Sequence, residues 1–148
     1  MMQAASVQSR DDGYQISVSS VAAPVPRPDE VLIRVAATAL NRADLLQARG
    51  LYPPPPGASP ILGLECSGWR EDTGEAVMCL LPGGGYAEYT TCPAGSFLPV
   101  PQGLNIVEAA GLMETFITAY LNIFELGKIN QGARVLVHGG GSGIGTSA

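Results

Sequence analysis

The spacing of apolar residues changes at Pro101, and this change constrains the fold more than any other feature of the chain. Before Pro101, short runs of alternating apolar and polar residues are separated by glycine and proline turns. After it, residues 105–126 carry apolar side chains at helical spacing, and Gly127 follows as a typical helix stop. Two such patterns in one chain of 148 residues predict a β region followed by the first elements of an α/β unit.

The β region is predicted from strand and turn signals. Residues 13–20 alternate as a half-buried strand does, and the β-branched run 31–40 is the clearest strand candidate. Shorter candidates follow near residues 65–70, 75–81, 86–92 and 97–100. Short strands punctuated by Gly and Pro are typical of a partly open, antiparallel β-barrel. The predicted class is therefore mainly β with some α.

A short helix interrupts these strands. Asn41 is a suitable N-cap for a helix over residues 41–48 that ends at Gly50. The following run, "LYPPPPGASP", cannot form regular structure, because its prolines fix φ and lack N–H donors.

Charge and composition exclude several classes of protein. The net charge is −5 with a single lysine, Lys128, so neither nucleic acid nor an anionic membrane is an expected partner. There is no apolar run of about 20 residues and no signal-peptide pattern, and we expect a cytoplasmic protein. The three cysteines lack zinc-site spacing, so reduced core thiols are expected and no metal site. Their positions are Cys66, Cys79 and Cys92.

The last residues, "VLVHGGGSGIGTSA", have the pattern of a buried strand, a glycine turn and a helix start. Such a turn presents backbone N–H groups and a positive helix end, which suits a pyrophosphate. From Gly140 the turn has the sequence G-G-S-G-I-G, so Ser142 replaces the second glycine of the dinucleotide motif. Serine keeps the small size, and its hydroxyl could donate to a phosphate oxygen. Taken alone, this signal is weak.

Longer motifs strengthen the evidence for a dinucleotide site. The segments "ALNRADLLQARGLYPPPPGASPILGLECSG", "LLPGGGYAEYTTCP", "LPVPQGLNIVEAAGLMETFITAYLNIFELG" and "GARVLVHGGGSGIGTSA" occur in this order. Together they resemble the zeta-crystallin-like quinone oxidoreductases, a zinc-free branch of the medium-chain dehydrogenase/reductase superfamily. The resemblance covers nearly the whole chain from about Asp29.

The resemblance implies a fold and an activity. It implies a GroES-like catalytic domain over residues 1–112 and the start of an NADPH-binding Rossmann domain over residues 113–148. The implied reaction is hydride transfer from NADPH to a quinone or a related enone, in a homodimer when full length. On this interpretation the chain is an N-terminal part of a longer enzyme, so we expect weak NADPH binding and negligible turnover from it alone.

The resemblance also bears on metal chemistry. The zinc-dependent branch has a cysteine near "NRAD" and a "GHE" segment, where this chain has Asn41 and Gly63-Leu64-Glu65. Asparagine and leucine cannot replace a thiolate and an imidazole as zinc ligands. For Glu65, the retained acid, we expect a structural hydrogen bond or ion pair. His138 is expected to be a packed strand-end residue.

The resemblance also predicts site residues, because several positions of this chain match site positions of the family. Asn41 and Tyr52 match catalytic positions near the nicotinamide; alternatively, Asn41 only caps a helix and Tyr52 only begins the proline loop. Thr118 matches a threonine beside the nicotinamide carboxamide, although a helical threonine also bonds its own backbone. The expected pyrophosphate turn comprises Ser142, Gly143, Ile144 and Gly145. Tyr86 either closes the substrate pocket or packs on a β-turn.

Two other functions remain open from the sequence. Related zinc-free enzymes reduce the conjugated C=C bond of enoyl thioesters, so an enoyl-thioester reductase is the alternative within the enzyme class. A non-catalytic β-domain that binds a partner or self-associates through the exposed "VLVH" edge is the alternative outside it. The segment that would distinguish NADPH from NADH is not among the motifs found.

Overall fold

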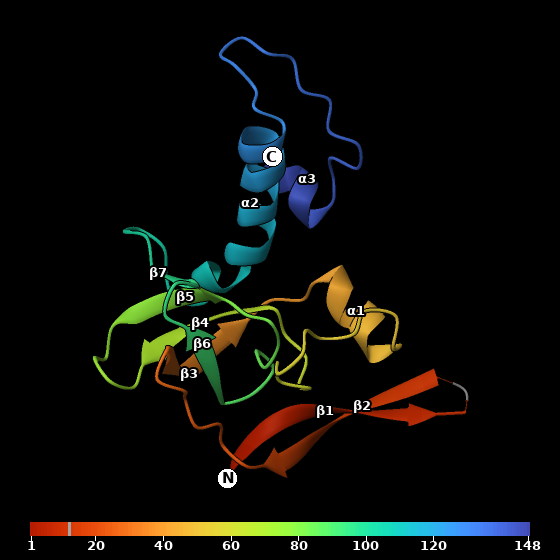
Figure 1. Cartoon of the computed structure of the whole chain (residues 1–148), viewed down its shortest axis with the longest axis vertical. Helices are drawn as coiled ribbons and strands as arrows, with labels where there is room; N and C mark the ends of the chain where they lie inside the picture. The colour runs from red at the N-terminus through yellow and green to blue at the C-terminus, as the bar shows by residue number, and fades with distance from the viewer. Residues whose placement is uncertain (12) are drawn as a thin grey trace.

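The computed structural model describes residues 1–11 and 13–148 and contains one hairpin, one larger sheet and several short helices (Figure 1). The strands are β1 Met2–Arg10, β2 Gly13–Val21, β3 Glu30–Thr38, β4 Glu65–Arg70, β5 Ala76–Leu80, β6 Tyr89–Pro93 and β7 Phe97–Pro99. The helices are α1 Arg42–Ala48, the 3₁₀ helix η1 Glu108–Gly111, α2 Met113–Tyr120, the π-helix η2 Leu121–Leu126 and α3 Gly143–Ser147. The fold is mainly β, as predicted.

Five strands form an antiparallel sheet in the order β6-β3-β4-β5-β7. A bulge between Val35 and Ala37 shifts the register of β3 against β4. Bulges increase the local twist, and this sheet curls into a half-barrel (Figure 1). The strands predicted from Gly and Pro punctuation are confirmed, with ends displaced by a few residues.

The sequence did not predict β1, whose residues, MQAASVQSR, are rich in polar side chains. This strand pairs with β2 over its whole length, from Met2 opposite Val21 to Arg10 opposite Gly13. The hairpin lies beneath the five-stranded sheet in Figure 1. The N–H of Ala5 donates to the carbonyl of Tyr86 over 2.8 Å and joins the hairpin to the segment before β6.

The core lies inside the curl of the sheet, where side chains from several strands meet. Its buried members come from β3, β4, β5 and β6, where alternate residues of a strand point to the same face, and from the residue directly after β5. They are Ile33, Cys66, Val77, Cys79, Leu81 and Cys92. Cys66 lies opposite Cys79 in the β4–β5 register. The prediction that the cysteines are small core residues is therefore confirmed.

The helical segment after Pro101 packs its first turns on the sheet. Ala109 of η1 and Met113 of α2 are buried against Met78 of β5. From there α2 and η2 rise away from the sheet, and α3 packs beside α2 (Figure 1). The predicted helical period is confirmed, with a π-helical last part that ends at Gly127.

The strand predicted over residues 133–138 is wrong for the structure. These residues have no regular secondary structure, and among the described residues no segment forms a ladder with them. Val135 is 50% exposed and Leu136 is 79% exposed. A strand requires backbone hydrogen bonds to a neighbour, which the apolar pattern of its own residues cannot provide.

Candidate functional site

Asn41 is the N-cap of α1, as predicted, and its backbone has the extended conformation that an N-cap requires. Its backbone N–H donates to Oδ2 of Asp44 over 2.8 Å. Its side-chain amide makes a longer-range contact: Nδ2 donates to Oε1 of Glu65 over 2.8 Å. Asn41 therefore joins the start of α1 to the start of β4.

Glu65 is 1% exposed, and both of its carboxylate oxygens have N–H donors. Oε1 accepts from Asn41, and Oε2 accepts the backbone N–H of Glu114 over 3.0 Å. Glu114 lies in the first turn of α2, where helix N–H groups have no partner within the helix. The structural hydrogen bond expected for Glu65 is therefore present.

Asp44 is the second buried carboxylate of this cluster, with 3% exposure. Its Oδ1 accepts the backbone N–H of Gly63 over 3.2 Å. Its Oδ2 accepts the N–H of Asn41 and the phenol of Tyr86, the latter over 2.7 Å. Asp44 was not predicted as a site residue, although Asn-x-x-Asp is a capping-box spacing that could have indicated it.

The hydroxyl of Tyr86 fixes this side chain in place: it donates to Asp44 and lies 3.2 Å from the carbonyl oxygen of Ala39. Burial and the hydrogen bond to the Asp44 carboxylate raise the pKa of the Tyr86 phenol. Burial, together with the neighbouring Glu65 and Asp44 carboxylates, raises the pKa of Glu114. Tyr86 thus remains a neutral donor to Asp44 at physiological pH, and its hydroxyl is occupied within the cluster.

Gly63 makes this arrangement sterically feasible. Its φ is +103°, a region that favours glycine. A Cβ atom built on Gly63 would lie 2.6 Å from the backbone nitrogen of Tyr86. The close approach of the "GLE" and "GGGY" segments therefore requires glycine at this position.

Tyr52 and Thr118, two other predicted site residues, lie outside this hydrogen-bonded cluster. Tyr52 is 46% exposed in the irregular segment after α1. Thr118 is half-buried on α2, about one helical turn beyond Thr115. The hydroxyl of Ser147 lies 2.9 Å from that of Thr115, so Thr118 belongs to the helix on which α3 packs.

The glycine turn leads into α3 and has the local geometry that its sequence predicts. Ser142 is the N-cap of α3, and its hydroxyl accepts the N–H of Gly145 over 3.0 Å. A Cβ on Gly145 would overlap the carbonyl oxygen of Gly139. Gly140, by contrast, has open space where a Cβ would be, and Ile144 is 45% exposed.

This turn fits a dinucleotide pyrophosphate in two respects. The overlap at Gly145 corresponds to the close packing that the third glycine of the motif permits. The open space at Gly140 and Gly141 leaves room for a group beside their backbone. The Ser142 oxygen accepts the N–H of Gly145 as the helix cap, and a hydroxyl that accepts in this way can still donate its own hydrogen.

The structure therefore brings the predicted residues together in two groups. Asn41 belongs to the carboxylate cluster, whereas Ser142, Gly143, Ile144 and Gly145 belong to the turn before or within α3. Helix α2 contacts both groups, through Glu114 at its start and through Thr115 opposite Ser147. No described contact joins Tyr52 to either group.

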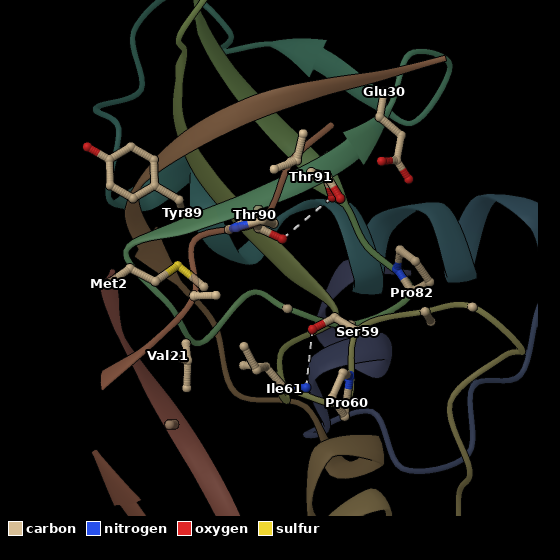
Figure 2. Close-up of a pocket in the computed structure, with 18 of the residues that line it drawn as sticks. Met2, Val21, Glu30, Ser59, Pro60, Ile61, Pro82, Tyr89, Thr90 and Thr91 are labelled. Atoms are coloured by element: carbon tan, nitrogen blue, oxygen red, sulfur yellow. Dashed lines mark hydrogen bonds between the residues drawn. The ribbon is translucent and has the colours of Figure 1, made fainter. Parts of the chain in front are cut away.

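Two cavities lie outside the carboxylate cluster. One, of about 560 Å³, lies between the β1–β2 hairpin, β6 and the loops around Ser59 and Pro82 (Figure 2). Its polar groups are partly used internally, since Ser59 Oγ accepts the N–H of Ile61. The other, of about 570 Å³, is an apolar groove beside α2 and η2, bordered by Val135 and Val137. Asn41 lines neither cavity.

The described residues contain no group of three or more His, Cys, Asp or Glu side chains arranged to hold a metal ion.

The buried cysteines influence one another. The thiol of Cys66 raises the pKa of Cys79, and the thiol of Cys79 together with burial raises the pKa of Cys92. His138 is exposed in the turn before Gly139, which contradicts the packed strand end expected for it. Within the same residues, no helix is long and apolar enough to cross a membrane.

Comparison with known proteins gives a consistent result. Residues 27–102 match the family described as the alcohol dehydrogenase GroES-like domain. The chain is 33% identical over 140 residues to the synaptic vesicle membrane protein VAT-1 homolog-like of Mus musculus, covering 88% of this chain and 34% of that protein. It is similar in structure to the quinone oxidoreductase of Thermus thermophilus, solved also with NADPH, at 35% identity and a TM-score of 0.82.

That superposition covers 99% of this chain and 48% of the Thermus enzyme. The CurK enoyl reductase superposes with a TM-score of 0.79 at 28% identity, covering 99% of this chain and 49% of that structure. The chain therefore spans about a third of the mouse relative and about half of each solved enzyme.

Proposed function

The chain belongs to the alcohol dehydrogenase GroES-like domain family of the medium-chain dehydrogenases/reductases, and from this we propose that its protein reduces quinones or related enones with NADPH and without zinc. One observation supports the proposal that the reaction proceeds without zinc. The buried Glu65 carboxylate is satisfied by two N–H donors, from Asn41 and Glu114. An asparagine amide thus occupies a position where the zinc-dependent relatives are expected to have a metal ligand.

In this proposal Asn41 binds the substrate oxygen. One Nδ2 hydrogen is donated to Glu65, and the second remains for another acceptor. When hydride adds to a quinone, negative charge develops on the carbonyl oxygen, and a fixed N–H donor stabilises that charge. NADPH, when bound, supplies the hydride. The residues expected to hold it are Thr118, Ser142, Gly143, Ile144 and Gly145.

Tyr52 is the proposed source of a proton. Hydride addition to a quinone gives a hydroquinone monoanion, which needs one proton to become the neutral hydroquinone. The exposed phenol of Tyr52 can donate that proton and recover it from solvent. Quinone reduction depends little on such an acid, because the aromatic oxyanion is already stable. We therefore assign Asn41 the larger contribution.

The test is an assay on a chimera. Residues 1–148 replace the corresponding half of the Thermus thermophilus quinone oxidoreductase, and NADPH oxidation is followed with naphthoquinone and with an enoyl-CoA. We expect naphthoquinone reduction that a metal chelator does not lower. The unaltered Thermus enzyme is the positive control. A folded chimera that binds NADPH but does not reduce naphthoquinone would contradict the proposal, and chelator-sensitive turnover would contradict its zinc-free part.

The similarity to the CurK enoyl reductase favours one second candidate, reduction of the C=C bond of an enoyl thioester. The same assay separates the two, because a chimera that reduces enoyl-CoA much faster than naphthoquinone would support this candidate. The proposal also includes a homodimer for the whole protein, which sedimentation of the chimera measures.

A further inference from the structure

We propose that Glu65 is a positioning residue that sets Asn41 and the first turn of α2 at a fixed separation. This proposal rests on the proposed function, in which Asn41 binds substrate and α2 lies on the cofactor side. Its geometric basis is that one buried carboxylate accepts both N–H groups, at 2.8 Å and 3.0 Å. The partners lie 24 and 49 residues away in the sequence.

The two hydrogen bonds connect three elements that are otherwise distinct. Asn41 precedes α1, Glu65 begins β4, and Glu114 lies at the start of α2. The hydroxyl of Thr38, at the end of β3, donates to the backbone carbonyl of Glu65 over 2.7 Å and so holds the start of β4 against β3. Movement of α2 relative to α1 would therefore have to break a hydrogen bond to Glu65.

The charge on Glu65 suits both partners. An ionised carboxylate offers only acceptors, and both contacts come from donors. Its oxygen beside the N-terminal turn of α2 also complements the positive end of that helix.

The functional consequence follows from the placement of the two partners. Hydride transfer requires donor and acceptor atoms to be aligned at close range, and an error of about 1 Å can lower a rate by about 100-fold. Asn41 positions the acceptor, whereas α2 carries Thr118, assigned to the cofactor. Glu65 touches neither proposed ligand and acts through these two residues.

The first variant is Glu65→Gln, which keeps the size of the side chain. Its amide oxygen can accept from one partner, but its NH₂ group then faces the donor of the other partner. We expect the Glu114 amide of the 148-residue chain to exchange its hydrogen at least about tenfold faster. The matched control is Glu88→Gln, because Glu88 also accepts a backbone N–H, from Gln3, but at an exposed position. That control should leave Glu114 exchange unchanged.

The second variant, Asn41→Asp/Glu65→Gln, restores the hydrogen bond between positions 41 and 65 with donor and acceptor exchanged. The new glutamine NH₂ can donate to the introduced aspartate, while its oxygen accepts from Glu114. We expect Glu114 exchange to return towards the wild-type rate, even if the single variant folds poorly. Exchange that is unchanged in Glu65→Gln, or that the double variant does not slow again, would overturn the proposed link.

The kinetic part uses the active chimera. We expect Glu65→Gln to lower kcat for naphthoquinone by about 100-fold while KM changes by less than about threefold. A larger change in KM than in kcat, or an unchanged kcat despite faster Glu114 exchange, would overturn the positioning role. Failure of the wild-type chimera to reduce any substrate would instead contradict the proposed function, and hydrogen exchange in the chain would still decide the link.

Discussion

The phenol of Tyr86 donates a 2.7 Å hydrogen bond to the buried carboxylate of Asp44, 42 residues away in the sequence. The same Asp44 oxygen accepts the N–H of Asn41, so the contact connects the segment before β6 with the N-terminus of α1. Both groups lie in a region with little access to water. The cluster around Asn41 therefore depends on a tertiary hydrogen bond that can be removed by a single atom change.

We expect Tyr86→Phe to lower the free energy of unfolding by about 1.5–3 kcal/mol, because it removes a hydrogen bond to a charged, buried group. Urea unfolding followed by circular dichroism measures this change. The matched control is Tyr89→Phe, since the Tyr89 hydroxyl takes part in no hydrogen bond among the described residues. A loss in Tyr86→Phe no greater than in this control would contradict the importance of the contact.

Stability should fall at alkaline pH. The pKa of Tyr86 is raised in the folded state, so the folded protein retains a proton that the unfolded chain releases above its ordinary pKa of about 10. The contribution of Tyr86 is therefore complete below about pH 10 and is lost as pH rises through the folded-state value. Phenolate absorbance should show one of the five tyrosines titrating late. Tyr86→Phe should remove that late step, and a titration without it would contradict the prediction.

Gly63→Ala should destabilise the fold by at least about 3 kcal/mol, through a positive φ and overlap with the backbone of Tyr86. Gly74→Ala separates the two causes, because Gly74 also has a positive φ but open space around the added methyl group. That control should cost only about 1–2 kcal/mol. Equal losses in thermal unfolding would show that the close approach to Tyr86 is unimportant.

Tyr52→Phe should leave stability within about 0.5 kcal/mol of wild type, because the side chain is exposed. In the chimera, we expect enone turnover to fall by about 100-fold, because a carbon must be protonated, whereas quinone turnover falls by less than about tenfold. Steady-state assays with both substrates measure the difference. Equal rates for wild type and variant with the enone would remove Tyr52 from the catalytic set.

The chain should self-associate as its concentration rises. It exposes 9133 Å², against about 7,100 Å² for a compact monomer of 15.3 kDa. Part of this surface is the irregular segment at residues 133–138, in which the apolar side chains of Val135 and Leu136 are exposed. Leu136→Lys should lower the average mass measured by light scattering, since a charge within an exposed apolar segment opposes its pairing with a second copy. Val25→Lys, also at an exposed position, should not change it.

Much of the β region was predictable because its signals are local. Glycine and proline turns bound β4, β5 and β7, and the N-cap signal located Asn41 before α1. The polar strand β1 was missed, because its burial depends on pairing with β2 and on the contact between Ala5 and Tyr86. The strand over residues 133–138 was predicted wrongly for the related reason that pairing is a property of two segments.

The candidate site shows the same division. The sequence predicted Asn41 and an acid in "GLE", because both residue types and their places in the motifs are visible in one dimension. Asp44 was missed, since its role depends on Gly63 and Tyr86, which approach it only in the folded chain.

By itself, the sequence determined the turns, the helix start at Asn41, the glycine turn at Ser142 and the family to which these motifs are similar, because each depends on residues close together in the chain. Only the tertiary structure decided which donors reach Glu65 and Asp44. Hydrogen bonds over 2.7–3.2 Å between segments 19 to 49 residues apart require the curled sheet to bring α1, β4 and α2 together first.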